Sequence, residues 1–190
     1  RKYFNEFNTR DINFRINTLK TIQRWIQNNQ DKIFDALEKD LNKCDAESYM
    51  CEIGMALSDI RYQINHLKKW SKRKIIIPPF SQFPSIAYKY YEPYGVTLVM
   101  STWNYPFLLS VQPTIASIAA GNTVILKPSA YSPNTSSLLK EMFTETCNKD
   151  LVTVIEGGRH ENEEILNQKL KKNYNIQVQL KLLLLEKQEQ

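Results

Sequence analysis

Polar side chains stand directly after two apolar segments in the middle of the chain. Asn104 follows the segment VTLVMS closely, and Lys127 ends the segment NTVILK. An asparagine amide in such a place can donate a hydrogen bond to the oxyanion of a tetrahedral intermediate, and a lysine ammonium has three donors for ribose hydroxyls or a phosphate. Each residue also has a plainer interpretation, because Asn104 can form a turn or a helix cap and Lys127 can simply be solvated. The pair at successive strand ends indicates a nucleotide cleft better than either residue alone.

The segments that would position this pair alternate between strands and helices from Tyr94 onward. VTLVMS, NTVILK and LVTVIEGG predict three strands, and connections of this length predict a right-handed parallel sheet. Such sheets bind ligands at the carboxyl ends of their strands. The dinucleotide fingerprint G-x-G-x-x-G is absent, and Gly157-Gly158 by itself indicates only a turn. The residues alone therefore predict an α/β sheet with a nucleotide cleft.

Proline and glycine mark the two helices between these strands. Pro106 suits the first turn of one helix and Gly121 its end, and Ser132-Pro133 opens the other helix. Pro113 lies inside the first helix, so we expect a kink or a split near Gln112.

Residues 1–74 are expected to form a helical segment. Thr9 can cap its first helix, and Asn28 to Gln30 indicate a break before the next one. Apolar positions three or four apart predict a later helix with a long apolar stripe from Met50 to Trp70. We expect this stripe to pack against the chain's own sheet, although a coiled-coil partner would also explain it.

Residues 75–93 are expected to form a crossing segment and a strand arm. Three prolines between positions 75 and 84 exclude a central strand or a long helix there. Ser85 to Glu92 predicts a strand in a hairpin or an arm, with tyrosines that pack on a neighbouring surface rather than stack on bases.

Composition and charge argue against several classes of protein. The net charge is +5, and we interpret the basic run Lys68 to Lys74 as the solvated end of a helix rather than a nucleic-acid or anionic-lipid patch. Cys44, Cys51, Cys147 and the two histidines form no zinc-ligand pattern. The longest purely apolar run, Leu182 to Leu185, is far too short for a membrane span. We expect a cytoplasmic protein without metal, nucleic acid or membrane contact.

The motifs STWNYPF and IAAGNTVILKPS closely resemble those of the aldehyde dehydrogenase superfamily, in particular its class 3-like branch. The segments DALEKDLNK, HLKKW and EPYGV are also similar, and the resemblance runs from about Arg15 to Lys169. It implies an α/β fold: an N-terminal helical layer and strand arm, then the first half of a Rossmann-like parallel-sheet cofactor domain at residues 94–169. Residues 170–190 are an atypical tail, which we attribute to truncation or a shifted reading frame.

The resemblance also implies a reaction and a site. Such enzymes oxidise an aldehyde to a carboxylic acid with a cysteine nucleophile, a glutamate base and NAD or NADP as hydride acceptor. Asn104 would donate to the thiohemiacetal oxyanion, and a full-length form would be a homodimer. The cofactor would be bordered by Ser101, Thr102 and Trp103, held at its adenosine ribose by Lys127 and Ser129, and approached near its adenine by Gly157 and Gly158.

Two departures from the family pattern qualify this expectation. Ala130 stands where the family commonly has a glutamate that binds the ribose hydroxyls. The E-L-G-G-K and G-Q-x-C segments, which carry the base and the nucleophile, are absent, and none of the three cysteines lies in a matching motif. We therefore expect that this chain alone does not oxidise aldehydes. A non-catalytic cofactor-binding or interaction fragment is the alternative.

Overall fold

The computed structural model describes residues 1–167, and a parallel sheet organises their second half. The strands β3 (Val96–Met100), β4 (Thr123–Lys127) and β5 (Val152–Val154) lie in the spatial order β3-β4-β5. Val96 pairs with Thr123, and Val124 with Val152, both in parallel register. The three predicted strands and their parallel arrangement are confirmed. The proposed tail at 170–190 and its possible frameshift lie outside the described residues.

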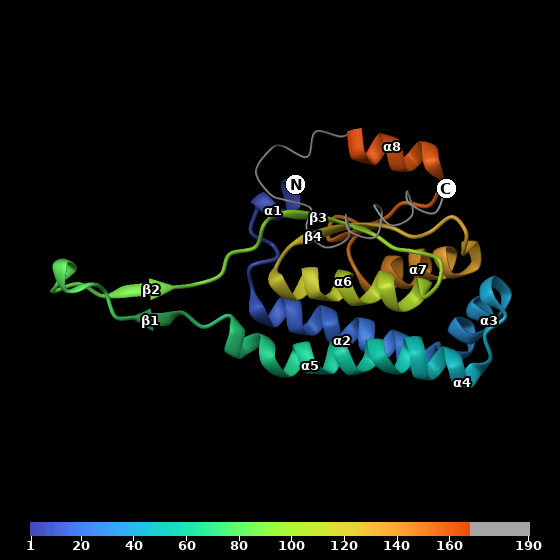
Figure 1. Cartoon of the computed structure of the whole chain (residues 1–190), viewed down its shortest axis with the longest axis horizontal. Helices are drawn as coiled ribbons and strands as arrows, with labels where there is room; N and C mark the ends of the chain where they lie inside the picture. Colours follow the sequence, from blue (N-terminus) through green and yellow to red (C-terminus); the bar gives the residue numbers. More distant parts are fainter. Residues whose placement is uncertain (168–190) are drawn as a thin grey trace.

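Helices cover the two faces of this sheet unequally (Figure 1). α6 (Pro106–Ala120) and α7 (Pro133–Thr146) connect the strands and pack on one face, where Val99, Val124 and Leu126 join the main core. α8 (Arg159–Asn167) lies on the opposite side. There Leu98, Ile125 and Ile165 line a cavity of about 540 Å³. The fold class is α/β, as expected.

α6 begins and ends where its proline and glycine predict. Pro106 occupies its first turn, and Gly121 adopts φ 91°, a left-handed conformation that suits glycine, directly after its last residue. The predicted split near Gln112 is wrong, because α6 continues through Pro113 as one helix. Pro113 removes only its own N–H bond, and burial of α6 against α2, α5 and β4 keeps the helix together.

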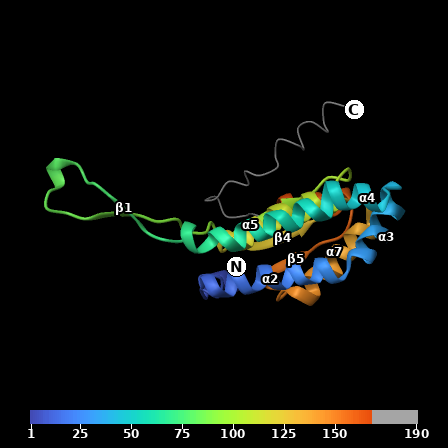
Figure 2. The same cartoon turned by 90° about the horizontal axis from the view of Figure 1, so that it is seen from below.

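A second layer of helices lies beneath α6 and α7, seen from below in Figure 2. It contains α2 (Ile12–Asn28), α3 (Gln30–Leu41), α4 (Asp45–Ser48), the π-helical turn η1 (Tyr49–Ile53) and α5 (Gly54–Trp70), and a short α1 (Lys2–Asn5) precedes it. The predicted break between Asn28 and Gln30 is confirmed.

Two expectations for this layer are wrong. α5 packs against α2 and α6 rather than on the sheet, and the ends of its stripe are exposed, with Met50 at 72% and Trp70 at 43%. Asp11, not Thr9, caps α2, because its carboxylate accepts from the first-turn N–H groups. Thr9 instead donates to the carbonyl of Gly121 at 2.6 Å and ties the N-terminal segment to the end of α6.

A hairpin arm projects away from the two layers (Figure 1). β1 (Lys74–Ile76) pairs antiparallel with β2 (Ala87–Lys89), and the 3-10 turn η2 (Phe80–Gln82) lies between them. The predicted strand is confirmed in shorter form, but its partner β1 was assigned to the helical and crossing segments. Tyr88, Tyr90 and Tyr91 are more than half exposed, so they do not pack as expected within the described residues.

The basic run extends from the exposed end of α5 into β1, with Lys68 and Lys69 in the last turn of the helix, where cations complement the helix dipole. No helix within residues 1–167 has the length and apolar character needed to cross a membrane.

Candidate cofactor and oxyanion site

Three segments meet at the carboxyl edge of the sheet: residues 101–105 after β3, 127–132 at the end of β4, and 155–158 after β5. The Ser101 N–H donates to the Lys127 carbonyl at 3.2 Å, and the Ile155 N–H donates to the Leu126 carbonyl at 2.8 Å. Continued parallel pairing thus places every site residue predicted from the sequence at one edge of one sheet.

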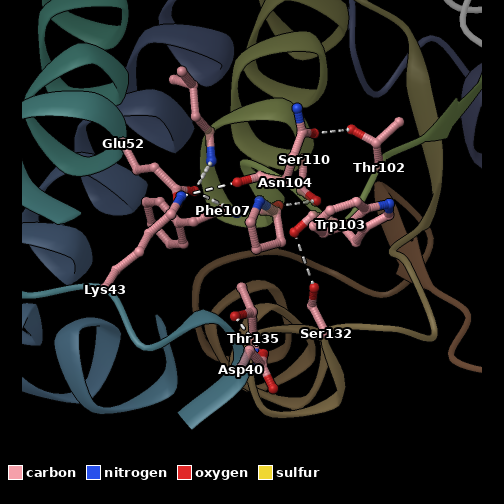
Figure 3. A network of polar contacts seen from close by, with 12 residues as sticks. Asp40, Lys43, Glu52, Thr102, Trp103, Asn104, Phe107, Ser110, Ser132 and Thr135 are labelled. Atoms are coloured by element: carbon pink, nitrogen blue, oxygen red, sulfur yellow. Dashed lines mark hydrogen bonds and ion pairs between the residues drawn. The ribbon is translucent and has the colours of Figure 1, made fainter. Parts of the chain in front are cut away.

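The Asn104 side chain is exposed at this edge and is oriented by its neighbour Thr102. The Thr102 hydroxyl donates to Oδ1 of Asn104 at 2.7 Å, which leaves the Nδ2 amino group as the donor for another molecule (Figure 3). Asn104 does not cap α6, because Tyr105 occupies the cap position and no side-chain cap bond forms there. The plainer interpretation of Asn104 as a helix cap is therefore wrong.

The first turn of α6 is capped by a buried carboxylate from η1. Oε2 of Glu52, which is 0% exposed, accepts from the Phe107 and Leu108 N–H groups at 2.9 and 3.1 Å. Oε1 accepts from the Lys43 ammonium at 2.6 Å, and that ammonium also donates to the Asn104 carbonyl at 2.9 Å (Figure 3). Sequence reasoning missed Glu52 and Lys43. The available signal was that Glu52, a carboxylate, directly precedes Ile53 of the predicted apolar stripe.

A second carboxylate occupies the first turn of α7. Asp40 accepts from the backbone N–H groups of Asn134 and Thr135 at 3.1 and 2.7 Å, and from both of their side chains. A helix N-terminus attracts anions through its free N–H groups and its dipole. Because Glu52 and Asp40 already fill these positions, neither α6 nor α7 offers an anion site for a cofactor pyrophosphate. This agrees with the missing glycine fingerprint.

Lys127 is buried at the edge rather than solvated. It is 3% exposed, and its ammonium donates to the carbonyls of Pro128 at 2.9 Å and Gly157 at 2.6 Å. Burial lowers the pKa of Lys127, and the nearby charge of Glu161 acts in the opposite direction. The interpretation of Lys127 as a merely solvated lysine is therefore wrong, and the contact brings Lys127 and Gly157 together.

The glycine turn after β5 is held by the first turn of α8. Gly157 has φ 136°, and the Gly158 N–H donates to Oε2 of Glu161 at 2.6 Å. The hydrogen bond from its own backbone N–H, and then this bond from Gly158, lower the pKa of Glu161. Glu156, on the same segment as Gly157, pairs with exposed Lys140 of α7 at 2.6 Å.

The remaining predicted residues lie in the edge segments 101–105 and 127–132. The Ser101 hydroxyl is 2.6 Å from that of Ser110, and Trp103 is half exposed. The Ser129 hydroxyl accepts from the Tyr131 N–H at 3.2 Å, and Ala130 beside it is exposed.

Comparison with known proteins bears on what this edge is for. The model of the aldehyde dehydrogenase family matches residues 1–173. The chain belongs to the aldehyde dehydrogenase family. It is 42% identical over 169 residues to aldehyde dehydrogenase family 3 member I1, chloroplastic, of Arabidopsis thaliana, covering 89% of this chain and 31% of the relative. It is 36% identical to the dimeric NADP-preferring aldehyde dehydrogenase of Canis lupus familiaris, covering 89% and 37%.

A solved structure agrees with these relatives. The substrate-bound state of Staphylococcus aureus AldH superposes with a TM-score of 0.85 at 39% identity, covering 87% of this chain and 36% of that one. The resemblance to the class 3-like branch is confirmed. The chain spans about a third of the length of the aldehyde dehydrogenases that it matches.

None of the cysteines occupies the place that an aldehyde dehydrogenase nucleophile would need at this edge. Cys44 precedes α4 and Cys51 lies in η1, so both are outside the three edge segments. Cys147 follows α7, and burial raises the pKa of its thiol to about 11. A thiol with so high a pKa is a poor nucleophile at neutral pH. Within residues 1–167, no group of three His, Cys, Asp or Glu side chains could hold a metal ion.

The donors at the edge fit the ribose of a nicotinamide dinucleotide. The two carbonyl bonds of Lys127 use two of its three N–H donors, and the Ser129 hydroxyl can still donate while it accepts from Tyr131. Oδ1 of Asn162, one turn into α8, is buried without a partner among the described residues. The edge therefore has donors for a polar ligand at Lys127 and Ser129.

Proposed function

We propose that this chain contributes the oxyanion donor and the ribose side of an NAD(P)-dependent enzyme that oxidises an aldehyde to a carboxylic acid. The observation that carries the proposal is the orientation of Asn104. Its Oδ1 accepts from Thr102, so the Nδ2 group of this exposed side chain is left as the donor at the edge where Lys127 also lies. Such a donor typically lowers the barrier by about 2.7–4 kcal/mol.

The residues of the edge have distinct roles in this proposal. Asn104 donates to the oxyanion that forms when a nucleophile adds to the aldehyde. NAD or NADP, when bound, accepts the hydride. Ser101, Thr102 and Trp103 border the cofactor, Lys127 and Ser129 donate to the adenosine ribose, and Gly157 and Gly158 let their backbone approach the adenine. The pyrophosphate is bound by residues other than the first turns of α6 and α7, because Glu52 and Asp40 fill those positions.

The chain by itself is proposed not to turn over aldehydes, because no cysteine lies at the edge to form the covalent adduct. The test incubates the purified chain with NAD or NADP and a range of aliphatic and aromatic aldehydes, and follows absorbance of the reduced cofactor. We expect no formation of reduced cofactor above that of a heat-denatured control. Formation that Asn104→Ala abolishes would contradict this proposal. Cofactor binding without turnover would fit both this proposal and the alternative of a non-catalytic cofactor-binding fragment.

Ala130 is proposed to favour NADP over NAD. A glutamate there would accept from the ribose hydroxyls of NAD, a type of bond worth about 1.5–3 kcal/mol, but would repel the 2′-phosphate of NADP. In a full-length form that carries this N-terminal part, we expect Ala130→Glu to tighten NAD binding and weaken NADP binding, about tenfold or more in each case, measured by calorimetric titration. Exposed Tyr131→Glu is the matched control for added charge. Equal changes for both cofactors would show that Ala130 does not face the ribose.

A homodimer and a cytoplasmic location complete the proposal. The canine relative is named dimeric, and the arm exposes large apolar side chains, including Ile77 at 92% and Phe80 at 93%. Such a surface suits a partner copy. All three cysteines are free thiols, which agrees with a reducing compartment.

A further inference from the structure

A buried ion pair links the helical layer to the backbone of Asn104. Lys43 and Glu52 are 7% and 0% exposed, and their charged groups are 2.6 Å apart. The Lys43 ammonium then donates to the Asn104 carbonyl at 2.9 Å and lies 4.1 Å from the centre of the Tyr105 ring. One charged group thus contacts two successive residues of the loop that carries the proposed oxyanion donor. Figure 3 shows its hydrogen bond to Asn104.

Capping of a helix does not by itself require a lysine. Asp40 caps α7 with the same kind of carboxylate bonds, and none of its hydrogen bonds in the described structure comes from a lysine. A buried ion pair is also weak evidence for stability, because its desolvation offsets most of its attraction. Neutralising Glu52 would require only one contact of the ammonium. The additional contacts with Asn104 and Tyr105 are what a positioning role needs.

We infer that Lys43 and Glu52 are positioning residues, which hold the Asn104 loop so that its amide points outward from the sheet edge. Glu52 fixes the start of α6 through Phe107 and Leu108, and Lys43 fixes the backbone of Asn104 against the same carboxylate. The loop is therefore held on both sides of Pro106. This inference rests on the proposed function in that Asn104 is the oxyanion donor, but the arrangement of the loop can be measured without any reaction.

The test records the side-chain amide signals of the chain labelled with ¹⁵N-asparagine, with the Asn104 signals assigned by their loss in Asn104→Ser. In Lys43→Met we expect these signals to shift toward the position of an asparagine amide whose Oδ1 accepts no hydrogen bond, because the bond from Thr102 would be lost. Lys43→Arg keeps the charge and can donate to both partners, so its Asn104 signals should stay close to their original positions. Lys39→Met breaks the exposed pair with Asp35 and is the matched control, with no shift expected.

A second variant covers the case in which Lys43→Met does not fold. The double variant Lys43→Met with Glu52→Gln leaves no buried unpaired charge, and the glutamine carbonyl can still accept from α6. It should show the same displacement of the Asn104 signals. Unchanged Asn104 signals in a folded Lys43→Met or double variant, even with a lower melting temperature, would overturn the inference and leave the pair a purely structural one.

The outcome is separable from that of the proposed function. The amide signals report the position of Asn104 in the absence of cofactor and aldehyde. Displaced signals would support positioning even if Asn104 proved to have no role in aldehyde chemistry. A role for Asn104 is tested instead by replacing it in a form that turns over.

Discussion

At the end of β3 the Asn104 loop rests on a buried ion pair, whereas at the end of β4 the Lys127 ammonium rests on backbone carbonyls. The supports of Asn104 come from residues 43 and 52, in the remote helical layer. Those of Lys127 come from Pro128 and Gly157, and the segment around Gly157 is held by the largely exposed Lys140–Glu156 pair and by Glu161. The proposed oxyanion side is thus supported from the core of the molecule, whereas the segment that supports the proposed ribose side is held in part by surface contacts.

The largest expected effect comes from breaking the support of the oxyanion side. Glu52→Ala removes the cap of α6 and leaves Lys43 as a buried, unpaired charge. The expected loss of unfolding free energy is about 3–5 kcal/mol, measured by urea denaturation.

The matching change on the ribose side is Lys140→Met, which breaks an exposed pair. It should lower the unfolding free energy by at most about 1 kcal/mol. A loss of similar size in the two variants would show that the two sides are not supported differently.

An intermediate effect is expected from the glycine turn beside Lys127. Gly157 has φ 136°, and an added Cβ would lie 2.5 Å from Glu161, so Gly157→Ala should lower the unfolding free energy by about 1–3 kcal/mol. It should also weaken cofactor binding, since the Gly157 carbonyl holds Lys127. Gly158→Ala is the matched control, because no atom lies within 4 Å of the Cβ it would add. If both substitutions lower the unfolding free energy equally, backbone strain at Gly157 is not the cause of the loss.

The smallest expected effect is a pH dependence of the ribose side. The pKa of Glu161 is lowered from its ordinary value of 4.5 by its own N–H and that of Gly158. A carboxyl group with a lowered folded pKa contributes stability above its ordinary pKa and loses it as the pH falls through the folded pKa. The Gly158 amide signal should therefore titrate with a midpoint below 4.5.

Two variants check that titration. Glu161→Gln should abolish it, and Glu163→Gln, whose carboxylate pairs with Arg159 instead, should leave it unchanged. A midpoint at or above 4.5 would mean that the bond to Gly158 does not favour the charged form.

Local signals in the sequence predicted much of the sheet half of the molecule. The apolar segments before Asn104 and Lys127 became β3 and β4, and Pro106 and Gly121 set the limits of α6. These predictions succeeded because each depends on a few neighbouring residues. Pro113 did not split α6, since packing on several sides outweighed the loss of one helix bond.

The long-range supports of the site could not be predicted in the same way. Glu52 reaches α6 across 55 residues, and Asp40 reaches α7 across 94. Thr9 had the residue type of a helix cap, yet its hydroxyl bonds Gly121, 112 residues away. A polar residue has several possible partners, and only the packing of the helical layer against α6 and α7 selects one of them.

The sequence by itself determined the family, the order of strands and helices, and the placement of Asn104 and Lys127 at strand ends, because periodicity and turn residues act over short distances. Only the tertiary structure decided that Lys127 is buried on carbonyls, that both helix N-termini hold carboxylates, and that Lys43 holds the Asn104 loop. Burial, charge pairing and the direction of a side chain depend on which elements meet, and these elements are far apart along the chain.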